Sequence, residues 1–137
     1  MNSLNESHSK NLFPCVCCGY LTLSSGAGSY EICTICWWED DLPQLRWPAM
    51  RGGANKPSLI EGQKNYLDFG ASTQARRDRA RSPRASEKRE HGWYAIDSHD
   101  SRFEAEGVHD GRWPADRQTL YWWRANYWRR IPDESTQ

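Results

Sequence analysis

Short apolar runs separated by turn residues dominate the first third of the chain. Residues 20–23 and 30–33 are brief runs of aromatic and aliphatic side chains, as in strands. Between them, residues 24–29 read Ser-Ser-Gly-Ala-Gly-Ser, which is turn chemistry. The pattern predicts two strands joined as a β-hairpin.

A helix is predicted over residues 59–69. Ser58 and Glu61 have the spacing of a capping box, in which each side chain accepts a hydrogen bond from the other residue's backbone amide. Gly70 follows as the terminator. Within the segment, four residues recur at helical spacing: Leu59, Gln63, Tyr66 and Leu67.

The last third of the chain is rich in aromatic residues. Residues 93–96 have the character of a strand, and residues 116–130 predict a helix that begins after a Trp-Pro pair and stops before Pro132. The buried stripe of this helix is expected at Leu120, Trp123, Tyr127 and Ile131, with Trp122 and Trp128 outside it. A helix that is apolar on so much of its circumference is either sandwiched or holds a partner.

Composition and charge narrow the function classes. The 137 residues include 18 basic and 18 acidic side chains, so the net charge of zero excludes a uniformly basic nucleic-acid binder and an acidic solvating tail. Only 37% of residues are hydrophobic and the mean hydropathy is −0.93, so the core is small or is helped by something besides apolar burial. No apolar run approaches the roughly 18–20 residues of a membrane helix, and no secretory signal is visible. We expect a cytoplasmic protein with no membrane partner.

These patterns predict a small α+β protein in four parts. Residues 1–11 form a disordered tail, and residues 12–70 form a zinc-ribbon-like β-hairpin unit with one packed helix. Residues 71–92 carry seven basic and three acidic side chains and no large apolar residue, which indicates a linker, a loop or a solvated helix extension. Residues 93–137 form an aromatic-rich segment that ends in a helix.

Five cysteines within 22 residues carry the clearest chemistry. Cys15, Cys18, Cys33 and Cys36 have the spacing C-x2-C-x14-C-x2-C, which is close to that of zinc ribbons. Each pair of cysteines lies on a tight loop, called a knuckle, and two knuckles together form a tetrahedral four-sulfur site. Such a site suits one structural Zn2+ and leaves no open position for catalysis. Redox chemistry or iron is the alternative for this site. Cys17 is the fifth cysteine and is not needed for a four-ligand site. It is either a small residue with no chemical role, a ligand in place of Cys15 or Cys18, or a reactive thiol.

The N-terminal half resembles the bacterial cysteine-rich CPCC family. The resemblance covers roughly residues 12–72 and is carried by residues 13–23, 28–33, 36–41, 52–55, 58–59 and 65–70. Residues 120–129 resemble the extension of longer members. Val16 and Thr34 stand where the family has proline. Because neither position supplies a metal ligand, this difference bears on the rigidity of the two cysteine loops and not on metal binding. The resemblance implies a small zinc-binding protein with no established catalytic role, and an immunity protein because members are often encoded near polymorphic-toxin loci.

We therefore expect a protein that is not an enzyme and acts by binding a cognate toxin and covering its active site. Trp37 is expected to pack over the metal knuckle. The predicted partner-binding residues are the acidic cluster with its neighbouring aromatic and the C-terminal aromatics with an arginine: Trp38, Glu39, Asp40, Asp41, Trp122, Trp128 and Arg129. The alternative is a nucleic-acid-binding regulator that uses the basic run 76–89, although its arginines are segregated in sequence from the aromatics. A third reading, a redox enzyme built on Cys17, predicts a thiol that reacts while the metal stays bound.

Overall fold

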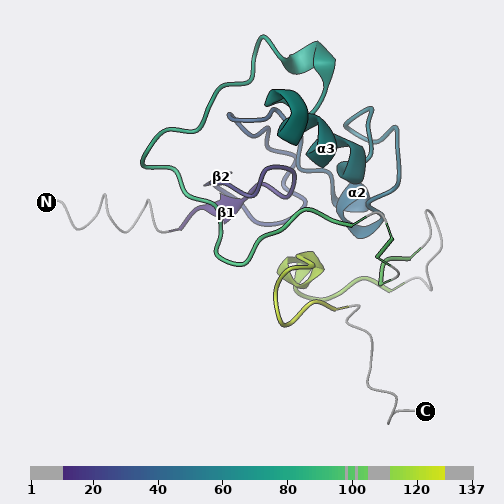
Figure 1. Cartoon of the computed structure of the whole chain (residues 1–137). Coiled ribbons are helices and arrows are strands. Elements are labelled where there is room, and N and C mark those ends of the chain that lie inside the picture. Colours follow the sequence, from purple (N-terminus) through teal and green to yellow (C-terminus); the bar gives the residue numbers. More distant parts are fainter. Residues whose placement is uncertain (1–10, 98, 101, 105–111, 129–137) are drawn as a thin grey trace, which may run out of the picture.

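The computed structural model describes residues 11–97, 99–100, 102–104 and 112–128. Within these residues the regular elements follow the order β1 (Phe13–Pro14), β2 (Leu21–Leu23), α2 (Leu42–Arg46), α3 (Leu59–Phe69) and two 3-10 helices, η1 (Gln74–Arg76) and η2 (Arg117–Leu120). Figure 1 shows the strands in the middle of the molecule, α3 above them and the C-terminal segment around η2 below them. The chain has the small α+β, zinc-ribbon-like fold that was predicted.

The strands pair differently from the prediction. β2 lies within the predicted strand 20–23, but its antiparallel partner is β1, with Phe13 opposite Leu23. Residues 30–33 form no strand, and Ile32 instead makes an isolated bridge to Glu39. The predicted hairpin is therefore wrong, because each extended segment pairs across its own cysteine loop. We call these loops the first knuckle (residues 15–19) and the second knuckle (residues 33–37).

The predicted helix is confirmed with both of its ends. The Ser58 hydroxyl accepts from the Glu61 amide at 3.1 Å, and the Glu61 carboxylate accepts from the Ser58 amide at 2.9 Å, so the capping box begins α3. Gly70 ends it at φ 84°. α2 was not predicted, because five residues are too few to show a helical period. An Asp41 side-chain oxygen caps α2 by accepting from the Gln44 amide at 3.0 Å.

The basic segment 71–92 is a loop with one 3-10 turn, a loop being one of its three predicted forms, and it lies against both knuckles. Its backbone donates from Ser72 to Cys36 O at 2.8 Å and from Arg81 to Ile35 O at 3.0 Å. Further on, the Lys88 carbonyl accepts from the β2 backbone at 2.9 Å. Figure 1 shows the segment as the long teal-to-green loop that leaves α3 and returns beside the strands. The composition of the segment gave no sign of this, because the three hydrogen bonds just described are made by its backbone. The domain boundaries at residues 70 and 92 stay a prediction.

The C-terminal aromatic segment is not an α-helix over residues 116–128, and residues 129 and 130 of the predicted helix lie outside the described residues. Within 116–128 the only helical element is the 3-10 helix η2, and Tyr121 leaves it with extended backbone. Tyr121 and Trp122 are both 1% exposed, and the Trp122 indole donates to Tyr94 O at 3.1 Å, so tertiary contacts on several sides replace the helical stripe. Residues 93–96 also form no strand, because the Ile96 amide donates at 2.8 Å to the Gln63 side chain rather than to a neighbouring strand.

The core is built around the cysteines. All five cysteines are buried at 1% exposure or less, and aliphatic and aromatic side chains from both ends of the described chain surround them. The largest of those that are almost completely buried are Trp38, Trp122, Tyr121, Ile35, Leu45, Leu59 and Leu120. Among the described residues no helix is long and apolar enough to cross a membrane.

Candidate metal centre

The two knuckles have the same backbone hydrogen bonds. In the first, the Cys15 amide donates to Tyr20 O at 2.9 Å and the Gly19 amide to Cys15 O at 2.6 Å. In the second, the Cys33 amide donates to Trp38 O at 3.0 Å and the Trp37 amide to Cys33 O at 2.9 Å. Each loop therefore turns tightly and presents its two cysteines to the same side.

The residue after each second cysteine has a left-handed backbone. Gly19 has φ 86°, and a Cβ at this position would lie 2.6 Å from Cδ2 of Trp93, so both conformation and space require glycine. The equivalent residue of the second knuckle is Trp37, with φ 66°. An L side chain in this region costs about 1–2 kcal/mol. The second knuckle is therefore strained where the first is not.

Folding brings the four predicted ligands together. The sulfurs of Cys15, Cys18, Cys33 and Cys36 all lie within 4.8 Å of one another. Cys15 Sγ is 3.5 Å from Cys36 Sγ, and Cys18 Sγ is 3.8 Å from Cys33 Sγ. These distances exclude disulfides, whose sulfurs lie about 2.05 Å apart. The four sulfurs form a compact buried cluster that could hold one metal ion.

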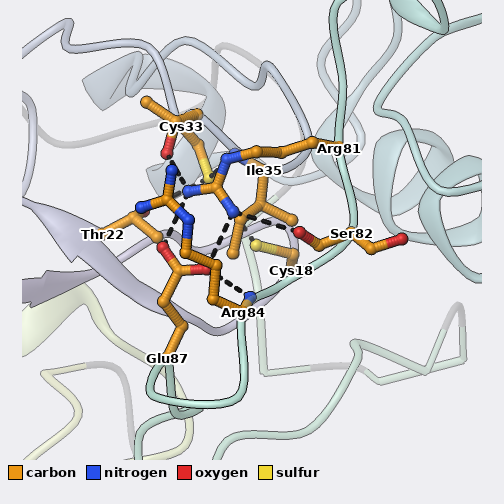
Figure 2. Close-up of polar contacts among 9 residues, drawn as sticks. Cys18, Thr22, Cys33, Ile35, Arg81, Ser82, Arg84 and Glu87 are labelled. Atoms are coloured by element: carbon orange, nitrogen blue, oxygen red, sulfur yellow. Dashed lines mark hydrogen bonds and ion pairs between the residues drawn. The ribbon is translucent and has the colours of Figure 1, made fainter.

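Hydrogen bonds and a side-chain clamp support the second knuckle. Figure 2 shows Thr22, from β2, and Arg81 converging on this knuckle. The Thr22 hydroxyl donates to Cys33 Sγ at 3.2 Å, and the Ile35 amide donates to the same sulfur at 3.4 Å. The Arg81 guanidinium donates to Glu87 at 2.7 and 2.8 Å, which fixes the loop that lies over the knuckle. Nothing in the sequence distinguishes Arg81 from the other arginines of its run.

The electrostatics of the cluster favour a cation. Burial raises the pKa of the Cys15, Cys18 and Cys36 thiols, because a dry site disfavours a thiolate. Hydrogen bonds from the thiols of Cys15 and Cys18 lower the pKa of Cys33. Four thiolates therefore need a metal ion to exist together here, and loading the metal displaces protons.

Cys17 lies outside the four-sulfur cluster. Its side chain is fully buried, and its sulfur is 3.4 Å from where a Cβ on Gly62 of α3 would lie. The cluster thus contains Cys15 and Cys18, and Cys17 packs against α3. A buried thiol facing a helix has no access for a substrate, which argues against the redox reading of this residue.

Four of the predicted partner-binding residues belong to the core. Trp38 and Trp122 are each 1% exposed, Asp40 is 2% exposed and Asp41 is 4% exposed, so a partner cannot touch them. Asp40 accepts from the Ser29 amide and hydroxyl at 3.0 and 3.1 Å, and Asp41 caps α2. The two carboxylates therefore bind groups inside the protein. The prediction that Trp38, Asp40, Asp41 and Trp122 contact a partner is wrong, because all four are buried.

The other three predicted residues have different outcomes. Glu39 is half-buried, and its backbone is held by Asn55 through hydrogen bonds of 2.8 and 2.9 Å. Trp128 is half-buried with the Arg46 guanidinium 4.7 Å from its ring centroid, so it packs within the protein. Arg129 lies outside the described residues.

The two adjacent tryptophans, Trp37 and Trp38, differ in burial. Trp38 was predicted to face a partner, yet it is in the core, whereas Trp37 was expected to pack over the knuckle and is half-buried. Sequence reasoning had no signal for this, because two adjacent tryptophans look alike until the positive φ of Trp37 turns its side chain away from the core.

A buried four-cysteine cluster between two knuckles in a small α+β fold defines the class: a cysteine-rich protein of the zinc-ribbon-like type. The comparison with family models agrees with this class. The model described as cysteine-rich CPCC matches residues 13–87, so the chain belongs to the cysteine-rich CPCC family. A search of curated proteins finds no match.

Proposed function

We propose that the four cysteines bind one Zn2+ as a structural site. The carrying observation is the set of sulfur distances, 3.5 and 3.8 Å for the two measured pairs. A tetrahedron with Zn–S bonds of about 2.3 Å has edges of about 3.8 Å, so the cluster has the right size for zinc. Four protein sulfurs complete the coordination and leave no position for substrate, which supports a role without catalysis.

Metal analysis tests this site directly. We expect one zinc per chain in the purified protein, and a strong chelator should abolish the cooperative melting transition. Cys33→Ser should lose the metal, whereas Cys17→Ser, an equally conservative change at a buried cysteine, should keep it. Full melting behaviour after complete removal of the metal would refute the proposal.

We further propose that the protein acts through protein–protein contacts, as the immunity protein of a polymorphic toxin in the cytoplasm. The support is the family membership together with the closed metal site. Because the acidic residues Asp40 and Asp41 are buried, this proposal no longer relies on them to fill a basic active site. Co-expression with the product of the adjacent gene should relieve its toxicity, and the two proteins should copurify. A neighbouring toxin that stays lethal under co-expression would contradict the immunity role.

A nucleic-acid-binding regulator is the second candidate, and one observation favours it. Four arginines of 76–89, segregated from aromatics in sequence, lie over aromatic rings in space. Arg77 is 5.0 Å from the Phe69 centroid and Arg89 is 4.8 Å from that of Tyr20. Sites for single strands combine arginines with aromatic rings on which bases stack. This candidate predicts salt-dependent binding to RNA or DNA that Arg77→Gln and Arg89→Gln weaken. Binding that does not change with salt would exclude it.

A further inference from the structure

The backbone of Trp37 is held in a conformation that suits glycine. The two knuckles share their hydrogen bonds, and Gly19 occupies in the first the position that Trp37 occupies in the second. Trp37 has φ 66°, where an L side chain is disfavoured. Strain of this kind persists where the surrounding structure holds it, and it concentrates at binding sites.

Packing in the core does not account for the tryptophan. Among the described residues, Trp37 belongs neither to the buried core nor to the half-buried apolar side chains that pack against it. Its ring contacts guanidinium groups instead, with Cζ of Arg76 and of Arg79 at 5.8 and 5.4 Å from the ring centroid. The strained position therefore presents an aromatic ring to the surface.

A cavity of about 310 Å³ lies beside this ring. Its size suits one or two amino-acid side chains. Its wall combines apolar side chains, hydroxyl and amide groups, and two cationic side chains. The lining residues are Trp37, Ala54, Pro57 and Ala75, then Asn55, Ser72 and Thr73, and finally Lys56 and Arg76.

The cations around the cavity have no acidic partner within the described ranges. Lys56, Arg76 and Arg79 form no ion pair there. By contrast, Arg81 is paired with Glu87 at 2.7 Å and Arg124 with Glu90 at 2.7 Å. The rim of the cavity therefore carries positive charge that a ligand can neutralise.

We propose that the cavity beside Trp37 binds an acidic peptide segment of a partner protein. An aliphatic or aromatic side chain of the partner enters between Trp37 and Pro57, and flanking carboxylates pair with Lys56, Arg76 and Arg79. Arginine pairs well with carboxylates because its planar fork matches them, and tryptophan is a common anchor of such contacts. This inference rests on the proposed role in protein–protein contacts and names the chemistry of the partner.

A peptide fits the cavity better than a nucleic acid does. Single-stranded nucleic acids are bound along grooves that offer successive aromatic platforms. This cavity offers one ring, and its remaining apolar wall is aliphatic, from Ala54, Pro57 and Ala75. A single ring therefore gives no platform for a second base, whereas it suffices for one side chain of a peptide.

Selection from a displayed heptapeptide library on the zinc-loaded protein tests the proposal. We expect the selected peptides to combine one large apolar residue with neighbouring aspartate or glutamate. A synthetic selected peptide, fluorescently labelled, is then titrated against the variants, with its Asn/Gln counterpart and a 20-nucleotide oligo-dT as alternative probes. Trp37→Gly should weaken peptide binding at least about 10-fold, as truncation of an anchor does. Its melting temperature should not fall by more than about 5 °C, because glycine relieves the backbone.

Matched charge variants complete the test. Arg76→Gln/Arg79→Gln should weaken peptide binding at least about 10-fold, whereas Lys64→Gln/Arg117→Gln, which removes the same charge from exposed positions outside this cavity, should leave it within about twofold. Four results would each overturn the proposal. The selected peptides lack acidic residues, or Trp37→Gly leaves peptide binding unchanged. Alternatively, Trp37→Gly lowers the melting temperature strongly, or the protein binds oligo-dT and the same variants lose that binding. No toxin is used in this experiment. A negative peptide-binding result therefore does not contradict the immunity role, and a negative co-expression result does not contradict peptide binding at the cavity.

Discussion

Replacing Arg46 with alanine tests whether a buried cation holds the C-terminal segment against α2, the helix that contains it. The Arg46 side chain is fully buried, and its Nε donates to Glu104 at 2.8 Å. Its guanidinium lies 5.1, 4.5 and 4.7 Å from the ring centroids of Trp47, Trp113 and Trp128. Three of these four partners come from the C-terminal part of the chain.

The structure sets the size of the effect. Removing one partner of a buried ion pair costs about 3–5 kcal/mol, because the other charge stays unpaired. Glu104 keeps 15% of its side-chain exposure and regains some hydration, which moves the value toward the lower end. Loss of the three cation–π contacts adds about 0.5–1 kcal/mol each if they are counted as solvent-exposed contacts. We therefore expect Arg46→Ala to lower the free energy of unfolding by about 5 kcal/mol, a large part of the total stability of a domain.

Urea unfolding followed by tryptophan fluorescence measures this loss, with free zinc held constant because metal binding shifts apparent stability. Arg46→Lys keeps the charge without the planar fork and should lie between wild type and alanine. The exposed Arg117→Ala is the control and should change stability by less than about 0.5 kcal/mol. A double-mutant cycle with Glu104→Ala should give a coupling energy of about 1–3 kcal/mol. A loss below about 1 kcal/mol for Arg46→Ala, the range of surface ion pairs, would refute the reasoning.

Three further predictions concern the knuckles and the metal. Gly19→Ala should cost about 2–5 kcal/mol in unfolding free energy, because its Cβ would lie 2.6 Å from Trp93 and its φ is 86°. The control Gly92→Ala, with φ 89° and open space around its Cβ, should cost only about 1–2 kcal/mol. Equal costs for the two variants would contradict a steric clash between residue 19 and Trp93. Cys17→Ala should retain one metal per chain by elemental analysis while Cys36→Ala loses it, and metal loss in the first variant would place Cys17 among the ligands. Because burial raises the pKa of Cys36 and two other thiols of the site, the metal displaces protons. Its affinity should therefore fall as pH falls, and acid titration should release the metal and unfold the chain together; a fold that outlasts the metal by a full pH unit would argue against this coupling.

Local sequence was sufficient where the deciding interactions are local. The spacing of Cys15, Cys18, Cys33 and Cys36 predicted the four-sulfur cluster, because two cysteines three positions apart on a tight turn face one centre. The serine–glutamate capping box and Gly70 predicted both ends of α3, because the hydrogen bonds that start and stop a helix join neighbours in the chain. The family resemblance rested on the same local features.

Contacts between distant segments decided the rest. The partner of β2, the seating of 71–92 on the knuckles and the irregular course of the C-terminal aromatics depend on which surfaces meet. Trp37 and Trp38 show this most directly, since the closed second knuckle leaves Trp37 half-buried and outside the core while Trp38 is buried in it. Residue type and period describe what a side chain prefers, but burial and charge pairing arise from the whole assembled chain. The sequence therefore determined the cysteine knuckles, and only the tertiary structure decided which of the predicted contact side chains are buried in the core.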